Sequence, residues 1–269
     1  MKTLRPLFLI VSLILMVGLA CAFGGTKATP TSAPEPTTAV EDQPTDEPTE
    51  ASADTPTDEP TQETSSDATP TNTPKTDAVA YYTEEFDGNL DNYTYVNEGK
   101  GDEKKMSLKT LDGALVFDLK GTNLWIYVTY NAFTYKDVAV EVVADNRGKN
   151  TNNISLLCRY SKDEGWYEFN ISNGGLYWIY AYDVTGAVRK GYNAITNGAS
   201  KLVKQGKGVN TYSASCIGNE LTLSINGTEV KTITDNKFDF SEGKVGFSVS
   251  SFDVTPILVN VDSFTISEP

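Results

Sequence analysis

The 269-residue sequence predicts an all-β fold, a two-sheet antiparallel sandwich that follows an extended acidic linker. From Tyr81 onward apolar residues recur with a period of two, which is typical of half-buried antiparallel strands. Turn residues separate these runs at regular spacing, and no segment offers three consecutive turns of helical apolar spacing. The length after Tyr81 is sufficient for one domain with a substantial core.

The N-terminus has the features of an export signal. Lys2 and Arg5 form a short basic region, and the apolar run over 7–19 is shorter than the ~20 residues that span a bilayer. A small residue precedes Cys21, so residues 1–21 are expected to be a signal peptide and Cys21 to be acylated. An ordinary signal-peptidase site in the same segment would give a secreted protein instead. We therefore expect export and a lipid anchor on the outer side of the cell membrane, or secretion if Cys21 is not used.

Residues 22–80 form the expected linker. They consist mainly of Thr, Pro, Ser, Ala, Asp and Glu, and the hexapeptide 44–49 is repeated at 56–61. Such a segment cannot bury enough apolar surface to offset the entropy lost on ordering. Its prolines and mutually repelling acids favour an extended spacer. The sequence thus predicts a spacer that holds one domain, residues 81–269, away from the cell envelope.

The strands of the domain are predicted from alternation. Asn226-Gly227 is a strong two-residue hairpin signal because both residues tolerate positive φ. The turn segments 163–165 and 173–175 divide the middle strands into a meander. The alternating segments are 138–142, 154–160, 167–171, 177–181, 221–225, 230–233, 245–249 and 259–261.

Composition excludes several classes of function. The chain carries a net charge of −14, most of it in the linker, and the domain has no basic cluster, so no nucleic-acid partner is expected. Histidine is absent, which removes the commonest general base and transition-metal ligand. Cys158 and Cys216 remain as an even pair in an exported domain and predict a disulfide, with two buried thiols as the alternative.

The order of motifs resembles the concanavalin A-like jelly-roll sandwich, which is also seen in laminin G-like domains. The branch that it most resembles is that of the 3-keto-disaccharide hydrolase-like domains. This resemblance implies a jelly-roll fold and carbohydrate-related work at the cell surface, and it supplies no catalytic residues. The motifs are Glu85-Phe86-Asp87, 157–160, 165–172, 175–177, 210–223, Asn226-Gly227, 243–247 and 261–264.

One face of the predicted meander is unusually aromatic. If the apolar phase faces the core, the opposite phase places aromatic and planar polar side chains together on one sheet face. Aromatic planes suit the apolar faces of sugars, so we expect this face to bind a glycan or polysaccharide. Alternatively, residues 186–208 cover the face, which would then be a second small core. The candidate ligand-binding residues are Arg159, Trp166, Glu168, Asn170, Trp178, Tyr180 and Tyr182.

Catalysis is not predicted. Retaining glucanases of this fold carry a Glu-x-Asp-x-Glu run, which places two carboxylates on one face, and no such run exists here. An enzyme would have to use Glu168 with Arg159, although that pair is more simply a cross-strand ion pair. The alternatives to glycan binding are a glycoside or 3-keto-disaccharide hydrolase-like enzyme and an adhesion module with a protein partner.

No cofactor is predicted, and a monomer is expected. Calcium is the one plausible ion, because Asp87 and Asp262 lie near the two ends of the domain. Their spacing carries no motif, so hydrogen bonds in turns or at strand edges are the favoured role. Contact with the membrane is expected only through the lipid anchor.

Overall fold

The computed structural model describes residues 78–269. The predicted signal peptide with Cys21, and the linker over 22–77, lie outside the described residues. Within the described part, no helix has the length and apolar character needed to cross a membrane. The single helix there is the short 3-10 helix η1 (Glu103–Lys105).

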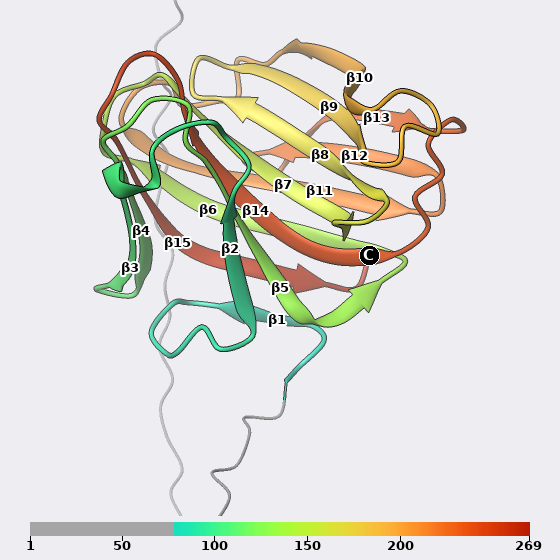
Figure 1. Ribbon diagram of the computed structural model, residues 1–269, viewed down its shortest axis with the longest axis horizontal. Coiled ribbons are helices and arrows are strands. Elements are labelled where there is room, and N and C mark those ends of the chain that lie inside the picture. The colour runs from blue at the N-terminus through green and yellow to red at the C-terminus, as the bar shows by residue number, and fades with distance from the viewer. Residues whose placement is uncertain (1–77) are drawn as a thin grey trace, which may run out of the picture. The chain divides into compact units, whose positions relative to one another are not determined.

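The domain consists of two antiparallel sheets that lie face to face (Figure 1). The first sheet has the order β13 (Thr228–Thr234), β12 (Glu220–Ile225), β11 (Gly208–Ile217), β6 (Val138–Asn146), β15 (Ile257–Ser267), β4 (Ala114–Leu119) and β3 (Met106–Leu111), and β1 (Tyr82–Glu84) pairs with β15. The second sheet has the order β10 (Gly191–Ala199), β9 (Leu176–Asp183), β8 (Gly165–Ser172), β7 (Asn152–Ser161), β14 (Gly243–Ser251), β5 (Trp125–Tyr135) and β2 (Tyr93–Asn97). The predicted two-sheet jelly-roll sandwich is confirmed.

One hydrophobic core fills the space between the sheets. It is built from the apolar phase of the strands, as alternation predicts. Phe247 of β14 packs against Phe264 of β15 and Phe117 of β4, with ring centroids 5.0 and 6.2 Å apart. The second sheet turns one face toward this core, so a site on this sheet would have to lie on its other face.

The eight segments predicted from alternation all lie in strands of the structure. At the tip of the β12–β13 hairpin, Asn226 and Gly227 have φ of 51° and 76°, as a two-residue turn requires. Strands β7, β8 and β9 pair in sequence as the expected meander. Residues 186–208, considered as a cover, instead contribute β10, which adds to the edge of the second sheet beside β9.

The predicted disulfide is present. Cys158 of β7 and Cys216 of β11 are both buried and are joined, with Cα atoms 6.6 Å apart. The bond links the two sheets across the core, so it restrains the same interface that hydrophobic packing stabilises.

The predicted position of Arg159 is wrong. The register of β7 shifts between Cys158 and Ser161, and Arg159 adopts a φ of 53° in this bulge. Its side chain therefore leaves the outward phase, while Tyr160, expected to face inward, packs on the outer side of the sheet. No Arg159–Glu168 ion pair forms among the described residues.

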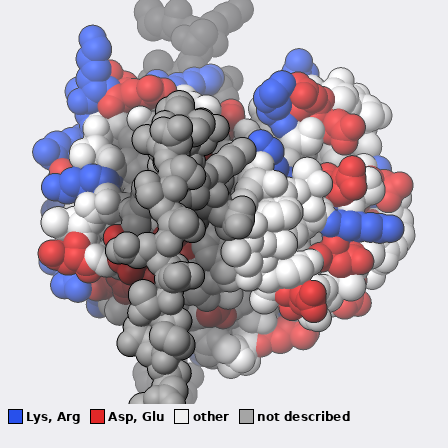
Figure 2. Space-filling model, turned by 90° about the horizontal axis from the view of Figure 1, so that it is seen from below, with Lys and Arg blue, Asp and Glu red and all other residues white. Residues whose placement is uncertain are grey.

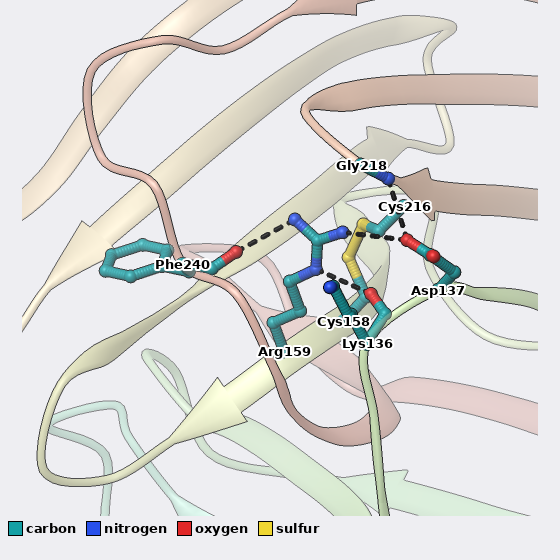
Figure 3. A network of polar contacts seen from close by, with 7 residues as sticks. All are labelled: Lys136, Asp137, Cys158, Arg159, Cys216, Gly218 and Phe240. Atoms are coloured by element: carbon teal, nitrogen blue, oxygen red, sulfur yellow. Dashed lines mark hydrogen bonds and ion pairs between the residues drawn. A yellow bond between two sulfur atoms is a disulfide. The ribbon is translucent and has the colours of Figure 1, made fainter.

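Arg159 instead holds an edge of the domain together (Figure 3). Its buried guanidinium donates hydrogen bonds to the carbonyl oxygens of Lys136 and Phe240 at 2.9 and 2.8 Å. It also pairs with Asp137 at 3.5 Å, and that carboxylate accepts the backbone N–H of Gly218 at 2.7 Å. These contacts join three loops beside the disulfide.

Charges on the domain surface are mixed. On the face shown in Figure 2, acidic and basic side chains are interspersed, and uncharged residues separate them. Among residues 78–269, no group of three potential metal-ligating side chains comes together. Asp87 is exposed, and Asp262 lies near Asp145, where burial and this second carboxylate raise its pKa. The structure brings no calcium ligand set to Asp87 or Asp262 in the described part.

Candidate functional site

The outer face of the second sheet carries the aromatic surface that the sequence predicts. Registers across the meander place Glu168 between Leu157 and Tyr180, whereas Asn170 lies between Ser155 and Trp178. All of these side chains belong to the phase opposite the core. Cross-strand neighbours on one face of an antiparallel sheet contact one another, and here they form a continuous polar and aromatic surface.

A cleft of about 470 Å³ opens on this face. Aromatic side chains form most of its walls, and amide, hydroxyl and carboxylate groups form the polar remainder. This size and composition are typical of sites that bind small organic ligands. The lining residues are Trp125, Tyr127, Asn153, Glu168, Asn170, Trp178, Tyr180, Tyr192, Ser250 and Phe252.

The predicted site residues fall into three groups. Glu168, Asn170, Trp178 and Tyr180 line the cleft. The other two aromatic candidates pack together beside it, and Arg159 lies at a different edge of the domain.

Trp166 is buried, with 2% of its surface exposed. Its indole stacks on Tyr182 at a centroid distance of 4.2 Å and lies 4.9 Å from the ring of Tyr160. Leu157 and Tyr127 also belong to this outer cluster, and Trp125 and Val184 pack against it. The alternative of a second small core is thus realised at one part of the face, while the cleft occupies another.

Strand β9 contributes two aromatic residues to the cleft. Trp178 and Tyr180 are both partly exposed, and their ring planes are within 8° of parallel, with centroids 6.5 Å apart. Tyr180 is braced edge-on by Tyr192 of β10. These rings offer flat apolar faces to a ligand in a fixed orientation.

Glu168 is the buried anchor of the polar groups. Its Oε2 accepts hydrogen bonds from the hydroxyls of Tyr127 and Tyr192 at 2.6 and 3.1 Å and from the Trp166 indole at 3.4 Å. Its Oε1 accepts from Ser155 at 2.7 Å and from the Asn170 amide at 3.2 Å. The carboxylate therefore holds residues from four strands in place.

The carboxylate also shapes the electrostatics of the cleft. Burial raises the pKa of Tyr127 and of Tyr192, and the adjacent Glu168 charge raises both further. Burial and the same charge raise the pKa of Tyr180. The three phenols consequently stay neutral, since an ionised phenol beside a carboxylate is disfavoured.

Several lining residues were not predicted from the sequence. Trp125 and Tyr127 come from β5, Tyr192 from β10 and Phe252 from the segment after β14. The run 125–130 alternates only weakly, because its outward residues are as apolar as its inward ones. The sequence signal for this strand is that it is apolar in both phases, which is typical of a strand with both faces buried.

Two buried polar atoms near the cleft lack hydrogen-bond partners among the described residues. They are the indole nitrogen of Trp125 and the hydroxyl of Ser248, which lies between Ser155 and Tyr127 in register. A buried polar group without a partner is costly, and a ligand or water molecule can satisfy it.

A second hollow of about 630 Å³ lies on the same face beyond the outer cluster. It is more charged than the aromatic cleft, with Glu98, Glu164, Glu242 and Lys244 among its lining residues. Few aromatic side chains line it, so it lacks the flat apolar walls of the first cleft.

Asp183 positions the loop that leads to Tyr192. Its carboxylate accepts the backbone N–H groups of Gly186, Val188 and Arg189 at 2.6, 2.8 and 3.1 Å. These hydrogen bonds, that of Val188 foremost, lower the pKa of Asp183 from an ordinary 3.8 to about 2. The loop is therefore fixed as long as the carboxylate is ionised.

This depressed pKa predicts a specific dependence on pH. The stabilisation from Asp183 should be fully present above its unfolded-state pKa and be lost as the pH falls from about 4 to about 2. The difference in unfolding free energy between wild type and Asp183→Asn, measured by urea unfolding, should shrink over this window. Asp163→Asn in an exposed turn is the control, and a difference that stays constant with pH would contradict the assignment.

Carboxylates are scarce among the described residues that line the cleft. Among the described residues that line it, Glu168 is the only carboxylate, and retaining glycoside hydrolysis uses two about 5 Å apart. Neutral donors engage both oxygens of Glu168, which leaves no vacant position for attack on a substrate. The other lining side chains carry aromatic rings, amides and hydroxyls.

Solved structures with the same fold include several enzymes that act on glucans. No protein-family model and no curated protein sequence matches the chain. The Bacillus licheniformis beta-glucanase is 15% identical, with 71% of this chain and 99% of that chain covered and a TM-score of 0.53. The laminarinase catalytic domain from Thermotoga maritima is 11% identical, with coverage of 71% and 98% and a TM-score of 0.54. A Bacillus subtilis protein of unknown function with a galectin-like fold is 10% identical, with coverage of 70% and 94% and a TM-score of 0.53.

The fold is that of a concanavalin A-like jelly roll. At these levels of identity the likeness establishes architecture alone, because such sandwiches host unrelated functions. The expected relation to 3-keto-disaccharide hydrolase-like domains stays a prediction.

Proposed function

We propose that this protein is a non-catalytic carbohydrate-binding protein whose aromatic cleft on the second sheet recognises a glycan. The observation that carries the proposal is the cleft itself, with the parallel rings of Trp178 and Tyr180 beside a polar floor that contains Asn170. Aromatic faces pack against the C–H surfaces of sugars, while planar polar groups bond their hydroxyls. The names of the beta-glucanase and the laminarinase support a carbohydrate ligand for this architecture.

The proposed setting is the outside of the cell. The disulfide between Cys158 and Cys216 supports an oxidising compartment. The predicted signal peptide and acylation at Cys21 would anchor a monomer on the outer side of the cell membrane, and the linker would let its cleft reach glycans beyond the envelope.

Removing the Trp178 ring is expected to abolish most of the binding. In electrophoresis through gels that contain soluble polysaccharides, the full-length wild type should be retarded by at least one of them. Trp178→Ala should bind at least about tenfold more weakly. Truncating a tryptophan that a ligand buries typically lowers the binding free energy by about 2 kcal/mol or more. The fold should persist, since the ring is partly exposed and lies outside the core.

Tyr95→Ala is the matched control. Tyr95 is an aromatic residue of the same sheet that is 62% exposed and does not line the cleft, so its loss should leave retardation unchanged. Retardation of Trp178→Ala equal to that of wild type would place binding elsewhere. If no polysaccharide retards the wild type, the glycan proposal fails and a protein partner becomes the leading hypothesis.

A further inference from the structure

The aromatic cleft contains a negative charge without a cation. Glu168 is 2% exposed, and it takes part in none of the ion pairs among the described residues. No lysine or arginine is among the described side chains that line the cleft. A buried carboxylate normally has a cationic partner, because neutral hydrogen bonds compensate only part of its lost hydration.

Two phenols connect the Glu168 carboxylate to the cleft through hydrogen bonds. Tyr127 donates to Oε2, and its hydroxyl lies 2.6 Å from that of Tyr192, which also reaches the same oxygen. Both phenolic protons are therefore directed toward the carboxylate or the neighbouring phenol. The remaining lone pairs of the two hydroxyls can only accept hydrogen bonds, and a chain of hydrogen bonds to an anion strengthens them as acceptors.

Aromatic faces add to the preference for positive charge. Trp125, Trp178, Tyr180 and Phe252 also line the cleft, and the face of an aromatic ring attracts a cation. The cleft thus combines strong acceptors, a nearby carboxylate and several π-faces. A neutral sugar would use the rings but would leave the charge without a partner.

We infer that the preferred ligand is a glycan whose sugar units carry a protonated amine, with the ammonium group seated against the partly exposed Tyr192 hydroxyl and the aromatic walls. This inference rests on the proposed function and narrows its ligand class. An amine-bearing glycan is favoured over a polycation without sugar rings. The reason is that the rings of Trp178 and Tyr180 are nearly parallel, and the Asn170 amide also lines the cleft.

Three β-1,4-linked hexasaccharides of equal length test the inference with the full-length protein. They are the glucosamine oligomer, its fully N-acetylated counterpart and the plain glucose oligomer; a lysine hexapeptide is the fourth ligand. Titration calorimetry at neutral pH and moderate salt is expected to show that wild type binds the glucosamine oligomer at least about tenfold more tightly than the other three. The affinity for this oligomer should fall as the pH is raised and its amines lose their protons.

Glu168→Gln removes the charge with little change in shape. It is expected to lose the preference for the amine: its affinity for the glucosamine oligomer should be about tenfold lower or more, and it should no longer bind this oligomer more tightly than the glucose oligomer. Glu164→Gln, an exposed acid beside the second hollow, is the matched control and should behave as wild type. If Glu168→Gln does not fold, Tyr192→Phe removes one acceptor hydroxyl and should reduce the same preference.

The outcomes separate this inference from the function on which it rests. Equal or tighter binding of the glucose or N-acetylated oligomer by wild type would overturn the amine preference and keep the glycan-binding proposal. Binding of the lysine peptide as tight as that of the glucosamine oligomer would also overturn it, because charge alone would then decide. Failure of every oligosaccharide, together with every polysaccharide in the gel screen, would overturn both.

Discussion

Replacing Trp166 with alanine is expected to lower the free energy of unfolding by about 3–5 kcal/mol, the range for removing a large buried aromatic side chain. The indole is 2% exposed and is enclosed by Tyr182, Tyr160 and Tyr127. Its removal would leave a cavity in the outer cluster and take one donor from Glu168. Urea unfolding of wild type and variant measures the difference.

Trp178→Ala is the informative comparison for Trp166→Ala. Its ring lies in the cleft and is partly exposed, so the loss of stability should be only about 1 kcal/mol, while binding is lost. Trp166→Phe should recover part of the stability, because a ring again fills the cluster. A Trp166→Ala protein as stable as wild type would show that the outer cluster does not pack as described.

Loss of the disulfide is the second large expected effect. Cys158 and Cys216 are 58 residues apart, and closing a loop of that length stabilises the folded state by about 4 kcal/mol in the chain-entropy account, within a usual range of about 2–5 kcal/mol. The double variant Cys158→Ala, Cys216→Ala should therefore unfold at a markedly lower urea concentration. Wild type measured with a reducing agent should lose a similar amount of stability.

The control for the disulfide is the double variant itself in reducing buffer. Without thiols to reduce, its stability should be the same in both buffers. Equal stability of oxidised and reduced wild type would contradict a structural role for the bond.

Alternation in the sequence identifies strands that have one buried face and one solvent-exposed polar face. In β12 the outward residues are polar, so the alternation is visible in the sequence. Strand β5 does not show this alternation because Trp125 and Tyr127 are aromatic and face outward. Strand β10 does not show it either, because Gly191–Ala199 is rich in small and polar residues.

The candidate site was predictable to the extent that the alternation was unbroken. Glu168, Asn170, Trp178 and Tyr180 line the cleft because β8 and β9 keep their period of two across the meander. Arg159 does not, because one extra residue in β7 reverses the phase. Such a bulge leaves little trace in a single sequence.

Burial on the outer face was the other property that the sequence did not reveal. Whether Trp166 or Trp178 is covered depends on which side chains meet it from β5, β7 and β10. Those contacts arise from pairing between distant segments, and local patterns do not encode them. The covered and open parts of this face therefore became apparent only in three dimensions.

One titration can show whether the cleft on the second sheet binds a glycan without cleaving it. Full-length wild type and Trp178→Ala are titrated calorimetrically with the best-binding oligosaccharide, and reducing ends are counted in the same samples after prolonged incubation. We expect saturable 1:1 binding by wild type, binding at least about tenfold weaker in Trp178→Ala, and no new reducing ends. Equal binding by the two proteins, or release of reducing ends by wild type, would contradict it.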